Sequence, residues 1–244
     1  MKKVLCGIVC VAAGAALAVE PVTVATVEVR AVNSGLTNTI VAIPGLDLAT
    51  GGALAISNLV KTTNLAAGDM LYAFSNGEYE TWELVNTAGV KHWEKATIKC
   101  TIRADGQDTE AGASSASYTM SVGSGIWLSR KMSGSTGAFY VYAQKPASID
   151  DSTVAAGATE LLGNPTGDDA TPTIDGAQNG DQIIVPSSTG FLKVVNFTYE
   201  VKDDVGAWVD DDFKSGLPSN LIKAGTGFWY KAASDGSTRT ISWQ

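Results

Sequence analysis

The chain has 244 residues, of which 45% are hydrophobic and 17% are charged, so it is long and apolar enough to bury one large core or two modest ones. Its formal net charge of -8 at pH 7 disfavours binding to nucleic acid and to anionic membrane surfaces. The chain has a single histidine and three cysteines, and two of these, Cys6 and Cys10, lie in an N-terminal segment that we expect to be cleaved. The remaining His92 and Cys100 are too few for a zinc site built from several His or Cys ligands.

The first residues have the composition of an export signal. Lys2 and Lys3 precede an uncharged run over 4–17, and small residues, Ala16 and Ala18, stand at the two positions that a signal peptidase reads. We therefore expect a signal peptide at 1–18 and residence in the periplasm, at the cell surface or outside the cell. A retained membrane anchor is the alternative, but the run is shorter than the roughly 20 apolar residues that cross a bilayer, so no membrane insertion is expected.

Short segments rich in Val, Thr and aromatic residues follow one another along the rest of the chain, and Gly, Asn, Asp, Ser or Pro separates them. Branched and aromatic side chains favour an extended backbone, and the turn residues mark its ends. The pattern predicts an all-β protein, with two short helical pieces at 53–60 and 154–162. The strands expected in chain order are 21–32, 39–43, 70–74, 118–122, 138–142, 182–185, 191–199 and 238–243.

An internal repeat is the most specific signal in the sequence. The motif Gly-x-Gly-apolar-Trp-apolar occurs at 123–128 and again at 225–230, and Gly-Ser-Thr closes both copies after the same interval. A match at one fixed offset indicates duplication. We therefore predict two tandem, related β-sandwich or barrel-like modules at 33–144 and 158–244, with an N-terminal strand at 19–32 before them and a linker at 145–157 between them.

Each copy of the motif is expected to form a strand–turn–strand unit. The second glycine of each copy would permit a tight or positive-φ backbone. The tryptophan would fill the core of its module, because a folding requirement places the same residue in both copies. The six signature residues are Gly123, Gly125, Trp127, Gly225, Gly227 and Trp229.

Other landmarks keep the same order in both modules. Gly-Asp opens an apolar run at 68–69 and at 180–181, and a tryptophan lies in mid-module at Trp93 and Trp208. The Gly-Asp pair predicts a turn leading into a strand, with the aspartate accepting hydrogen bonds from nearby backbone amides. The N-terminal strand at 19–32 has no counterpart in the second copy, so it is either an edge strand of its own module or a strand that pairs with a neighbouring subunit.

With a Gly-Asp strand start, a mid-module tryptophan and a closing Gly-x-Gly-Phe-Trp, the chain resembles a group of exported bacterial proteins of unknown activity. The resemblance covers most of the chain after residue 18, and it implies tandem β modules at the cell envelope without implying any chemistry. The first copy departs from the pattern, since it has Ile126 and Leu128 where the second has Phe228 and Tyr230.

Aromatic side chains are the main candidates for ligand contacts, because sugars stack their C–H faces on tryptophan and tyrosine rings. Alternation of acidic and aromatic residues over 78–83 places the two kinds of side chain on opposite faces of a strand. The alternative is that these aromatic residues belong to the core. The candidate glycan-binding residues are Tyr79, Trp82, Trp93, Trp208 and Tyr230.

Consecutive aspartates supply the hard oxygen ligands that calcium prefers, and calcium is the one cofactor that the sequence suggests. Their spacing matches no known calcium loop, so a solvated acidic turn is the favoured interpretation. The residues that a calcium site would use are Asp203, Asp204, Asp210, Asp211 and Asp212.

Catalytic motifs are scarce. Glutamates supply carboxylates for a glycoside hydrolase, but the sequence shows no paired arrangement, and His92 is the only histidine available as a general base. Cys100 would share one strand face with Ile98 and Ile102, because successive side chains point to opposite faces. This favours a buried thiol over a disulfide with another chain.

These observations predict a non-enzymatic exported protein with a structural, adhesive or assembly role at the cell envelope or outside the cell. A carbohydrate-binding module is the alternative, and a glycoside hydrolase is a weaker one. The expected partners are further copies of the chain or an extracellular glycan, and no nucleic acid.

Overall fold

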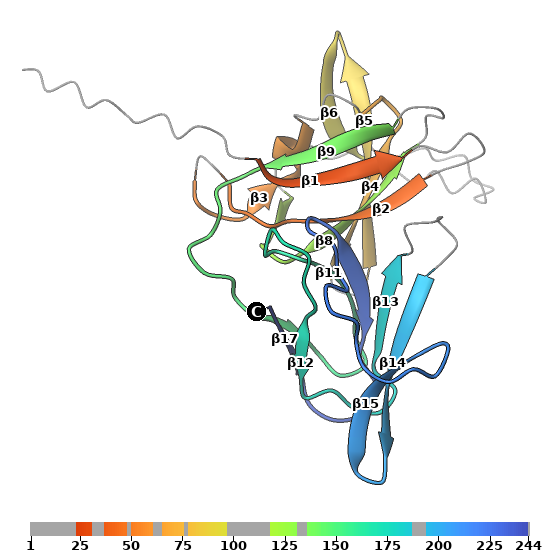
Figure 1. Cartoon of the computed structure of the whole chain (residues 1–244). Helices are drawn as coiled ribbons and strands as arrows, with labels where there is room; N and C mark the ends of the chain where they lie inside the picture. The colour runs from red at the N-terminus through yellow and green to blue at the C-terminus, as the bar shows by residue number, and fades with distance from the viewer. Residues whose placement is uncertain are drawn as a thin grey trace, which may run out of the picture.

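The computed structural model describes residues 23–30, 37–47, 50–60, 65–75, 78–96, 118–130, 136–186 and 194–243 (Figure 1). The regular structure of these residues is β-strand apart from one 3-10 helix, η1 (Ile56–Val60), so the all-β prediction is confirmed. The predicted export signal at 1–18, together with Cys100 and Gly134, lies outside the described residues.

The first half of the chain builds a five-stranded antiparallel sheet with the spatial order β2-β8-β4-β5-β6. In β4, Leu71 and Ala73 are buried whereas Tyr72 and Phe74 are not, which is the alternation of a strand with one face on a core. The strands of this first sheet are β2 (Thr37–Ala42), β4 (Met70–Ser75), β5 (Glu78–Thr87), β6 (Val90–Lys95) and β8 (Gly125–Arg130).

The second half builds another five-stranded antiparallel sheet, which lies below the first in Figure 1. Its spatial order is β11-β16-β13-β14-β15. In both sheets the first strand in chain order lies at an edge, the last lies beside it, and the remaining three follow in sequence. The strands of this second sheet are β11 (Thr159–Gly163), β13 (Gln182–Pro186), β14 (Val194–Lys202), β15 (Val205–Asp210) and β16 (Gly227–Lys231).

Smaller sheets accompany the two large ones. β1 (Thr23–Arg30) pairs with β9 (Thr136–Tyr142), and β3 (Leu54–Ala55) pairs with β7 (Thr119–Met120). In the second half, β17 (Arg239–Ser242) follows β16 in the chain, as β9 follows β8 in the first half. In a three-stranded sheet, β17 lies between β10 (Ser152–Val154) and β12 (Thr173–Asp175) and pairs with both.

The structure differs from the sequence analysis in the segments that precede each large sheet. β10 pairs with β17 as β1 pairs with β9, so the N-terminal strand does have a counterpart, and it pairs with a strand of its own chain. β10 lies inside 145–157, which the sequence marks only as a linker. The predicted helix at 154–162 is wrong, because this segment joins β10 to β11 through a turn.

Each large sheet covers a hydrophobic core with one of its faces. The first core contains the 3-10 helix and two tryptophans, and the second contains one residue of β17. The large buried side chains of the first include Leu71, Trp82, Leu84, Trp93 and Leu128, and those of the second include Ile183, Phe197, Phe228, Tyr230 and Ile241.

The two Gly-Asp pairs form the predicted turns. The N–H of Ala66 donates to Asp69 (2.9 Å), and the N–H of Gln178 donates to Asp181 (3.0 Å). The glycine before each aspartate has a positive φ, 91° in the first turn and 92° in the second. The expected local hydrogen bonding of these aspartates is therefore confirmed.

Both aspartates are fully buried and face an arginine, a contact that the sequence analysis did not predict. Nε of Arg130 on β8 lies 3.4 Å from Oδ2 of Asp69. Arg239 on β17 donates from Nε and Nη2 to the two carboxylate oxygens of Asp181, each at 2.9 Å. Tyr230 adds a hydroxyl donor to Asp181 at 2.6 Å, so this carboxylate is fully satisfied inside the second core.

Candidate functional site at the junction of the two sheets

The two large sheets meet where the strands with the repeated motif begin. The N–H of Ala42 donates to the carbonyl of Gly225 (2.9 Å), and the N–H of Gly163 donates to the carbonyl of Gly123 (2.7 Å). Ala42 ends β2, and Gly163 ends β11, the equivalent strand of the other sheet. Each half of the chain therefore gives the other the same hydrogen bond, and the junction has pseudo-two-fold symmetry.

The second glycine of each motif makes room for the other half of the chain. A Cβ at Gly227 would lie 2.7 Å from Cγ2 of Ile40 in the first sheet, as well as 2.2 Å from the carbonyl oxygen of Leu162 on the neighbouring strand of its own sheet. A Cβ at Gly125 would lie 2.9 Å from Cγ of Leu161. Ile40 and Leu161 occupy equivalent positions in β2 and β11, so each glycine admits the aliphatic side chain of the opposite sheet.

The signature residues thus have roles that differ from those predicted. Positive φ belongs to the first glycine of each motif, Gly123 (83°) and Gly225 (71°), and the second glycine serves close approach. Trp127 and Trp229 are only half-buried and lie outside both core clusters. The prediction that these tryptophans fill the cores is wrong, because they face the junction.

Five aromatic rings gather on the outer side of this junction, and we call them the aromatic cluster. The ring centroids of Trp127 and Trp229 lie 6.3 Å apart, and that of Tyr72 lies 6.4 Å from Trp127. Phe74 and Tyr79 lie 5.3 Å and 5.8 Å from Trp229. These contacts are edge-to-face, the arrangement that aromatic quadrupoles favour.

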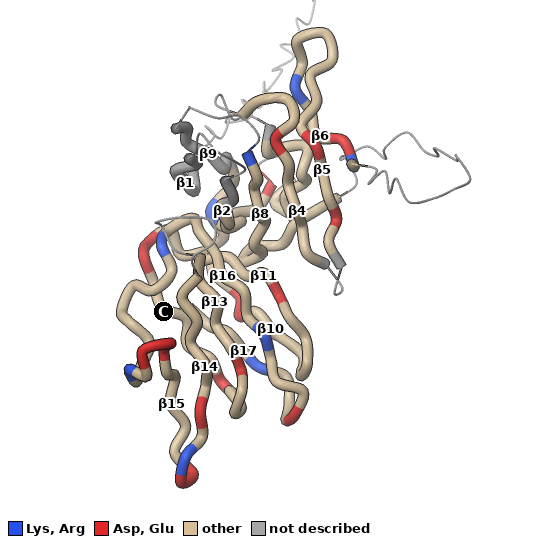
Figure 2. The backbone as a smooth tube through the Cα atoms, turned by 90° about the vertical axis from the view of Figure 1, so that its right-hand side faces the viewer, with Lys and Arg blue, Asp and Glu red and all other residues tan. Residues whose placement is uncertain are grey.

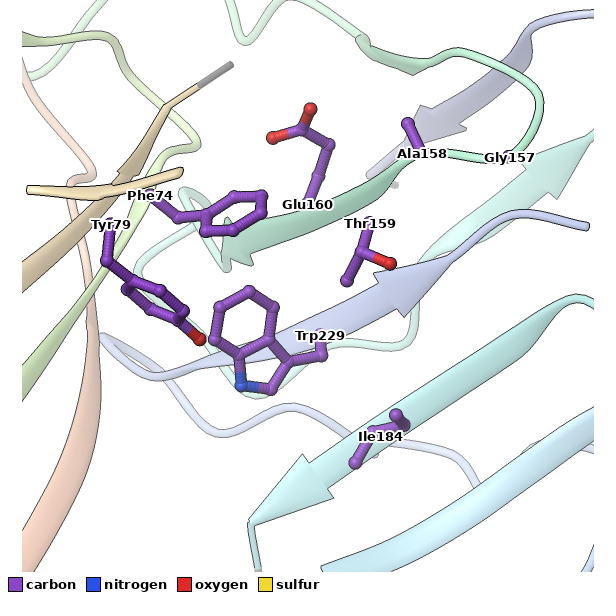
Figure 3. Close-up of a pocket in the computed structure, with 8 residues that line it drawn as sticks. All are labelled: Phe74, Tyr79, Gly157, Ala158, Thr159, Glu160, Ile184 and Trp229. Atoms are coloured by element: carbon purple, nitrogen blue, oxygen red, sulfur yellow. The ribbon is translucent and has the colours of Figure 1, made fainter. Parts of the chain in front are cut away.

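A groove of about 560 Å³ opens beside this cluster (Figure 3), and we call it the aromatic groove. Its volume falls in the range of small-molecule and side-chain binding sites. Both large sheets contribute to it, so it exists only when the two halves of the chain are joined. Its lining consists of Phe74, Tyr79, Gly157, Ala158, Thr159, Glu160, Ile184 and Trp229.

Two neighbouring polar side chains of β11 point in opposite directions at this groove. In Figure 3 the Thr159 side chain points towards Trp229, whereas the Glu160 carboxylate lies on the far side of Phe74. Burial raises the pKa of Glu160 and also that of Tyr79. The part of the groove beside Trp229 therefore has a largely apolar lining, with the hydroxyl groups of Thr159 and Tyr79 near it.

The structure brings one of the five predicted glycan-binding residues to this groove. Tyr79 lies on its wall and is 49% exposed. Trp82, Trp93 and Tyr230 are 2%, 1% and 0% exposed, so their assignment to a surface platform is corrected: they fill the cores. Trp208 is half-buried on β15 and packs against Tyr230.

The aspartates considered for calcium lie at opposite ends of β15. Asp203 and Asp204 form the turn before this strand, and residues 210–212 begin the turn after it, the red stretch at the upper end of β15 in Figure 2. Asp210 accepts the backbone N–H groups of Asp212 (3.0 Å) and Lys214 (2.8 Å). The structure does not bring the five together, and no three His, Cys, Asp or Glu side chains of the described residues gather as a metal site.

Sequence reasoning missed most of the groove. Phe74, Thr159, Glu160 and Ile184 were not candidates, and Trp229 was assigned to a core. One signal was present, since Phe74 alternates with buried residues of β4. A strand with apolar side chains on both of its faces predicts a contact on each face.

A comparison with protein-family models, curated proteins and solved structures finds no match to this chain. The resemblance to exported tandem-module proteins therefore stays a prediction. None of the helical structure in the described residues is long and apolar enough to span a membrane.

Proposed function

We propose that the protein is a non-enzymatic, exported component of an assembly at the cell envelope or outside the cell. The observation that carries this proposal is the position of its exposed apolar side chains. Of the seven large apolar residues exposed in the described part of the chain, five lie on the β14–β15 hairpin or in the turn that follows it. They are Val194, Val195, Val201, Val205 and Phe213.

The β14–β15 hairpin forms an arm whose turn projects at the bottom of the molecule in Figure 1. Val201 and Val205 flank that turn, whereas Val194 and Val195 begin β14 and Phe213 follows the end of β15, at the other end of the arm. Single exposed apolar side chains are ordinary, but a concentration of them on one element marks a surface that contacts another protein. Covering them with a second molecule removes apolar surface from water, which is worth about 25 cal/mol per Å². The arm therefore supports a role in association.

The groove supports binding rather than hydrolysis. Glu160 is the only carboxylate among its lining residues, whereas a glycoside hydrolase uses two carboxyl groups about 5–10 Å apart. His92 lies on β6, where its Nε2 atom is 2.7 Å from Oε1 of Glu94. Neither residue lines the groove, so the histidine offers no general base to a ligand bound there.

Light scattering over a concentration series of the exported chain, with negative-stain images of the same samples, tests the assembly role. We expect the mass to rise with concentration to that of oligomers or polymers. Association should persist at high salt, because apolar contacts are not screened as charge pairs are. A monomer at every concentration would remove the proposal.

Carbohydrate binding is a second candidate, favoured by the exposed ring of Tyr79 beside Trp229. Sugar rings stack on such faces, so Tyr79→Ala should abolish binding in a glycan screen. Val90→Ala is the matched control, because Val90 is also exposed (66%) but lies on another hairpin of the same sheet. Binding that survives in Tyr79→Ala would contradict this candidate.

A further inference from the structure

Phe213 is the most exposed large apolar residue of the described chain, at 83%. Its φ is +62°, in the left-handed region that bulky side chains disfavour. An apolar ring held in water on a strained backbone contributes nothing to the stability of its own fold. Strain at such a position indicates a contact with another molecule.

The turn that carries this ring is tightly built. Asp210 accepts N–H groups of two following residues through its side chain, and its own carbonyl accepts the N–H of Phe213 (2.9 Å). The N–H of Gly216 closes the turn onto the carbonyl of Trp208 (2.7 Å). A ring presented by a pinned turn loses little conformational freedom when it binds, which favours its use as an anchor.

The aromatic groove offers the chemistry that a phenyl ring needs. The planes of Phe74 and Trp229 meet at 87°, those of Tyr79 and Trp229 at 71°, and those of Phe74 and Tyr79 at 70°. These rings share no common flat face, so a sugar ring could stack on only one of them at a time. A further phenyl ring, in contrast, extends the same edge-to-face packing.

Anchor and groove lie towards opposite edges of the second sheet. β15, which leads into the Phe213 turn, forms one edge, and β11, which supplies Thr159 and Glu160, forms the other. With strands about 4.8 Å apart, the two edges are separated by roughly 19 Å. Phe213 is 83% exposed in its pinned turn and therefore does not occupy the groove of its own chain.

The charges around the two surfaces are complementary. Asp211 and Asp212 precede Phe213 and are exposed. Lys214 follows Phe213 and pairs with Asp212 at 3.2 Å, so Asp210 and Asp211 leave this turn with a net negative charge. Lys231 lies two residues after Trp229 on β16 and is also exposed, so alternation places it on the same face of the strand as Trp229. A ring entering beside Trp229 would bring the aspartates towards this lysine.

We propose that Phe213 of one copy docks in the aromatic groove of a second copy. The inference rests on the assembly role proposed above and names its contact. Two copies can exchange this contact reciprocally about a two-fold axis and form a closed dimer. If each pair makes the contact only once, a free groove and a free Phe213 remain, and repetition builds a ring or an open chain of copies.

Phe213→Asn tests the anchor without disturbing the turn, because Asn tolerates the left-handed region. We expect the dissociation constant of the assembly to rise about tenfold or more, as for other aromatic anchors, with the melting temperature unchanged or raised. Val90→Asn is the matched control, since it removes an exposed apolar side chain from the hairpin of the first sheet. It should assemble like the unaltered chain.

Tyr79→Ser tests the groove from the other side and should weaken assembly in the same way. The sharpest measurement is light scattering on an equal mixture of the two variants. The Tyr79→Ser chain keeps its Phe213, and the Phe213→Asn chain keeps its groove, so one contact per pair remains. The mixture should therefore form heterodimers and nothing larger.

The possible failures are distinguishable. If the unaltered chain is monomeric, the assembly role is removed and this contact with it. If the unaltered chain assembles and Phe213→Asn assembles equally well, the assembly role stands and this contact is wrong. If Tyr79→Ser loses glycan binding while its assembly is unchanged, the groove belongs to a carbohydrate and the proposed docking is overturned.

Discussion

Asp69 and Asp181 occupy the same turn in the two halves of the chain, yet their arginine partners come from different strands. Arg130 lies on β8 and Arg239 on β17. In the second half, the hydroxyl group of Tyr230 also donates a hydrogen bond to Asp181. The equivalent residue in the first half is Leu128, which has no hydroxyl group. Because a buried carboxylate is costly unless it is paired, both cores keep an arginine for it.

Asp181→Asn should lower the free energy of unfolding by about 3–5 kcal/mol, because it leaves the buried Arg239 without its counter-charge. Urea denaturation measures the change. Asp204→Asn is the matched control: it removes the same charge at an exposed turn position with φ 62°, a conformation that Asn tolerates. The control should keep its denaturation midpoint, and equal midpoints for both variants would contradict the prediction.

The same carboxylate makes stability depend on pH. Burial alone raises the pKa of Asp181, but hydrogen bonds from Arg239, Tyr230 and the N–H groups of Ala233 and Gln178 outweigh burial and hold this pKa below its usual value. The stabilisation is therefore complete above the unfolded-state pKa of about 3.9 and is lost as the pH falls through the lower folded-state pKa. Urea midpoints below pH 4 should fall more steeply for the unaltered chain than for Asp181→Asn, and parallel declines would count against this assignment.

At the residue scale, the sequence identified local signals and missed long-range partners. A Gly-Asp pair before an apolar run is enough to predict the turn at Asp69 and at Asp181. The arginines are distant in sequence and stand at non-equivalent positions, so comparing the repeats does not identify them. Tyr79 was found as an aromatic residue in an acidic segment, but the expected separation of the two kinds on opposite faces is wrong, because Trp82 shares its strand face with Glu80 and Tyr79 shares its face with Glu83. Ile184 comes near Tyr79 only when the two sheets join.

The hairpins β5–β6 and β14–β15 turn through two central residues with positive φ. The angles are 52° at Ala88 and 87° at Gly89, and 51° at Asp203 and 62° at Asp204. Two positive values are typical of a type I′ turn, whose twist matches that of the flanking strands. Aspartate and glycine tolerate this conformation, whereas it is energetically unfavourable for alanine.

Ala88→Asn should therefore stabilise the protein, by about 1 kcal/mol, and raise its melting temperature. Thr87→Asn places the same side chain one residue earlier, at an exposed strand position without a positive φ. That control should lower the melting temperature slightly, because Asn is a poor strand residue. A melting temperature for Ala88→Asn at or below that of the unaltered chain would show that this turn is not strained.

At the element scale, length did not decide which strands were predicted. The predicted ranges match the long β1, β2, β4, β9, β13 and β14 and the short β17, whereas the long strands β6, β11 and β15 were not among them. The alanines and leucines of 154–162 have a spacing that suits a helix as well as a strand. Gly157 has a positive φ of 75°, and the N–H of Ala158 bonds the carbonyl of Ala155 at 3.1 Å, so a turn divides the segment. β10 has only three residues, which is too few for an alternation to show.

The junction ties the two large sheets into one body. Each sheet supplies hydrogen-bond donors and acceptors to the other, and separating them would leave these groups and the aromatic cluster without their partners. We expect the chain to unfold in one transition, with equal van't Hoff and calorimetric enthalpies in scanning calorimetry. Two separate transitions would show that the junction does not couple the sheets.

Substitution of the junction glycines should follow a definite order. Gly227→Ala places a Cβ 2.2 Å from a backbone oxygen, whereas the nearest atom for Gly125→Ala is a side-chain carbon at 2.9 Å. Overpacking of this kind costs about 1–3 kcal/mol, so Gly227→Ala should have the lowest melting temperature and Gly125→Ala an intermediate one. Gly52→Ala, whose Cβ meets nothing closer than 3.5 Å, is the control. A reversed order would mean that the sheets do not meet as described.

The reciprocal junction also determines how much of the contact between the two sheets a single substitution can change. In a pair of identical modules, one substitution at the junction changes both symmetry-related contacts at once. In a single chain it changes only one of them and leaves the other to hold the sheets together. Ile184 pairs with Trp229 where Tyr72 pairs with Trp127, and the aromatic groove lies on the Ile184 side. The groove therefore breaks the pseudo-two-fold symmetry of the junction and gives this surface a direction.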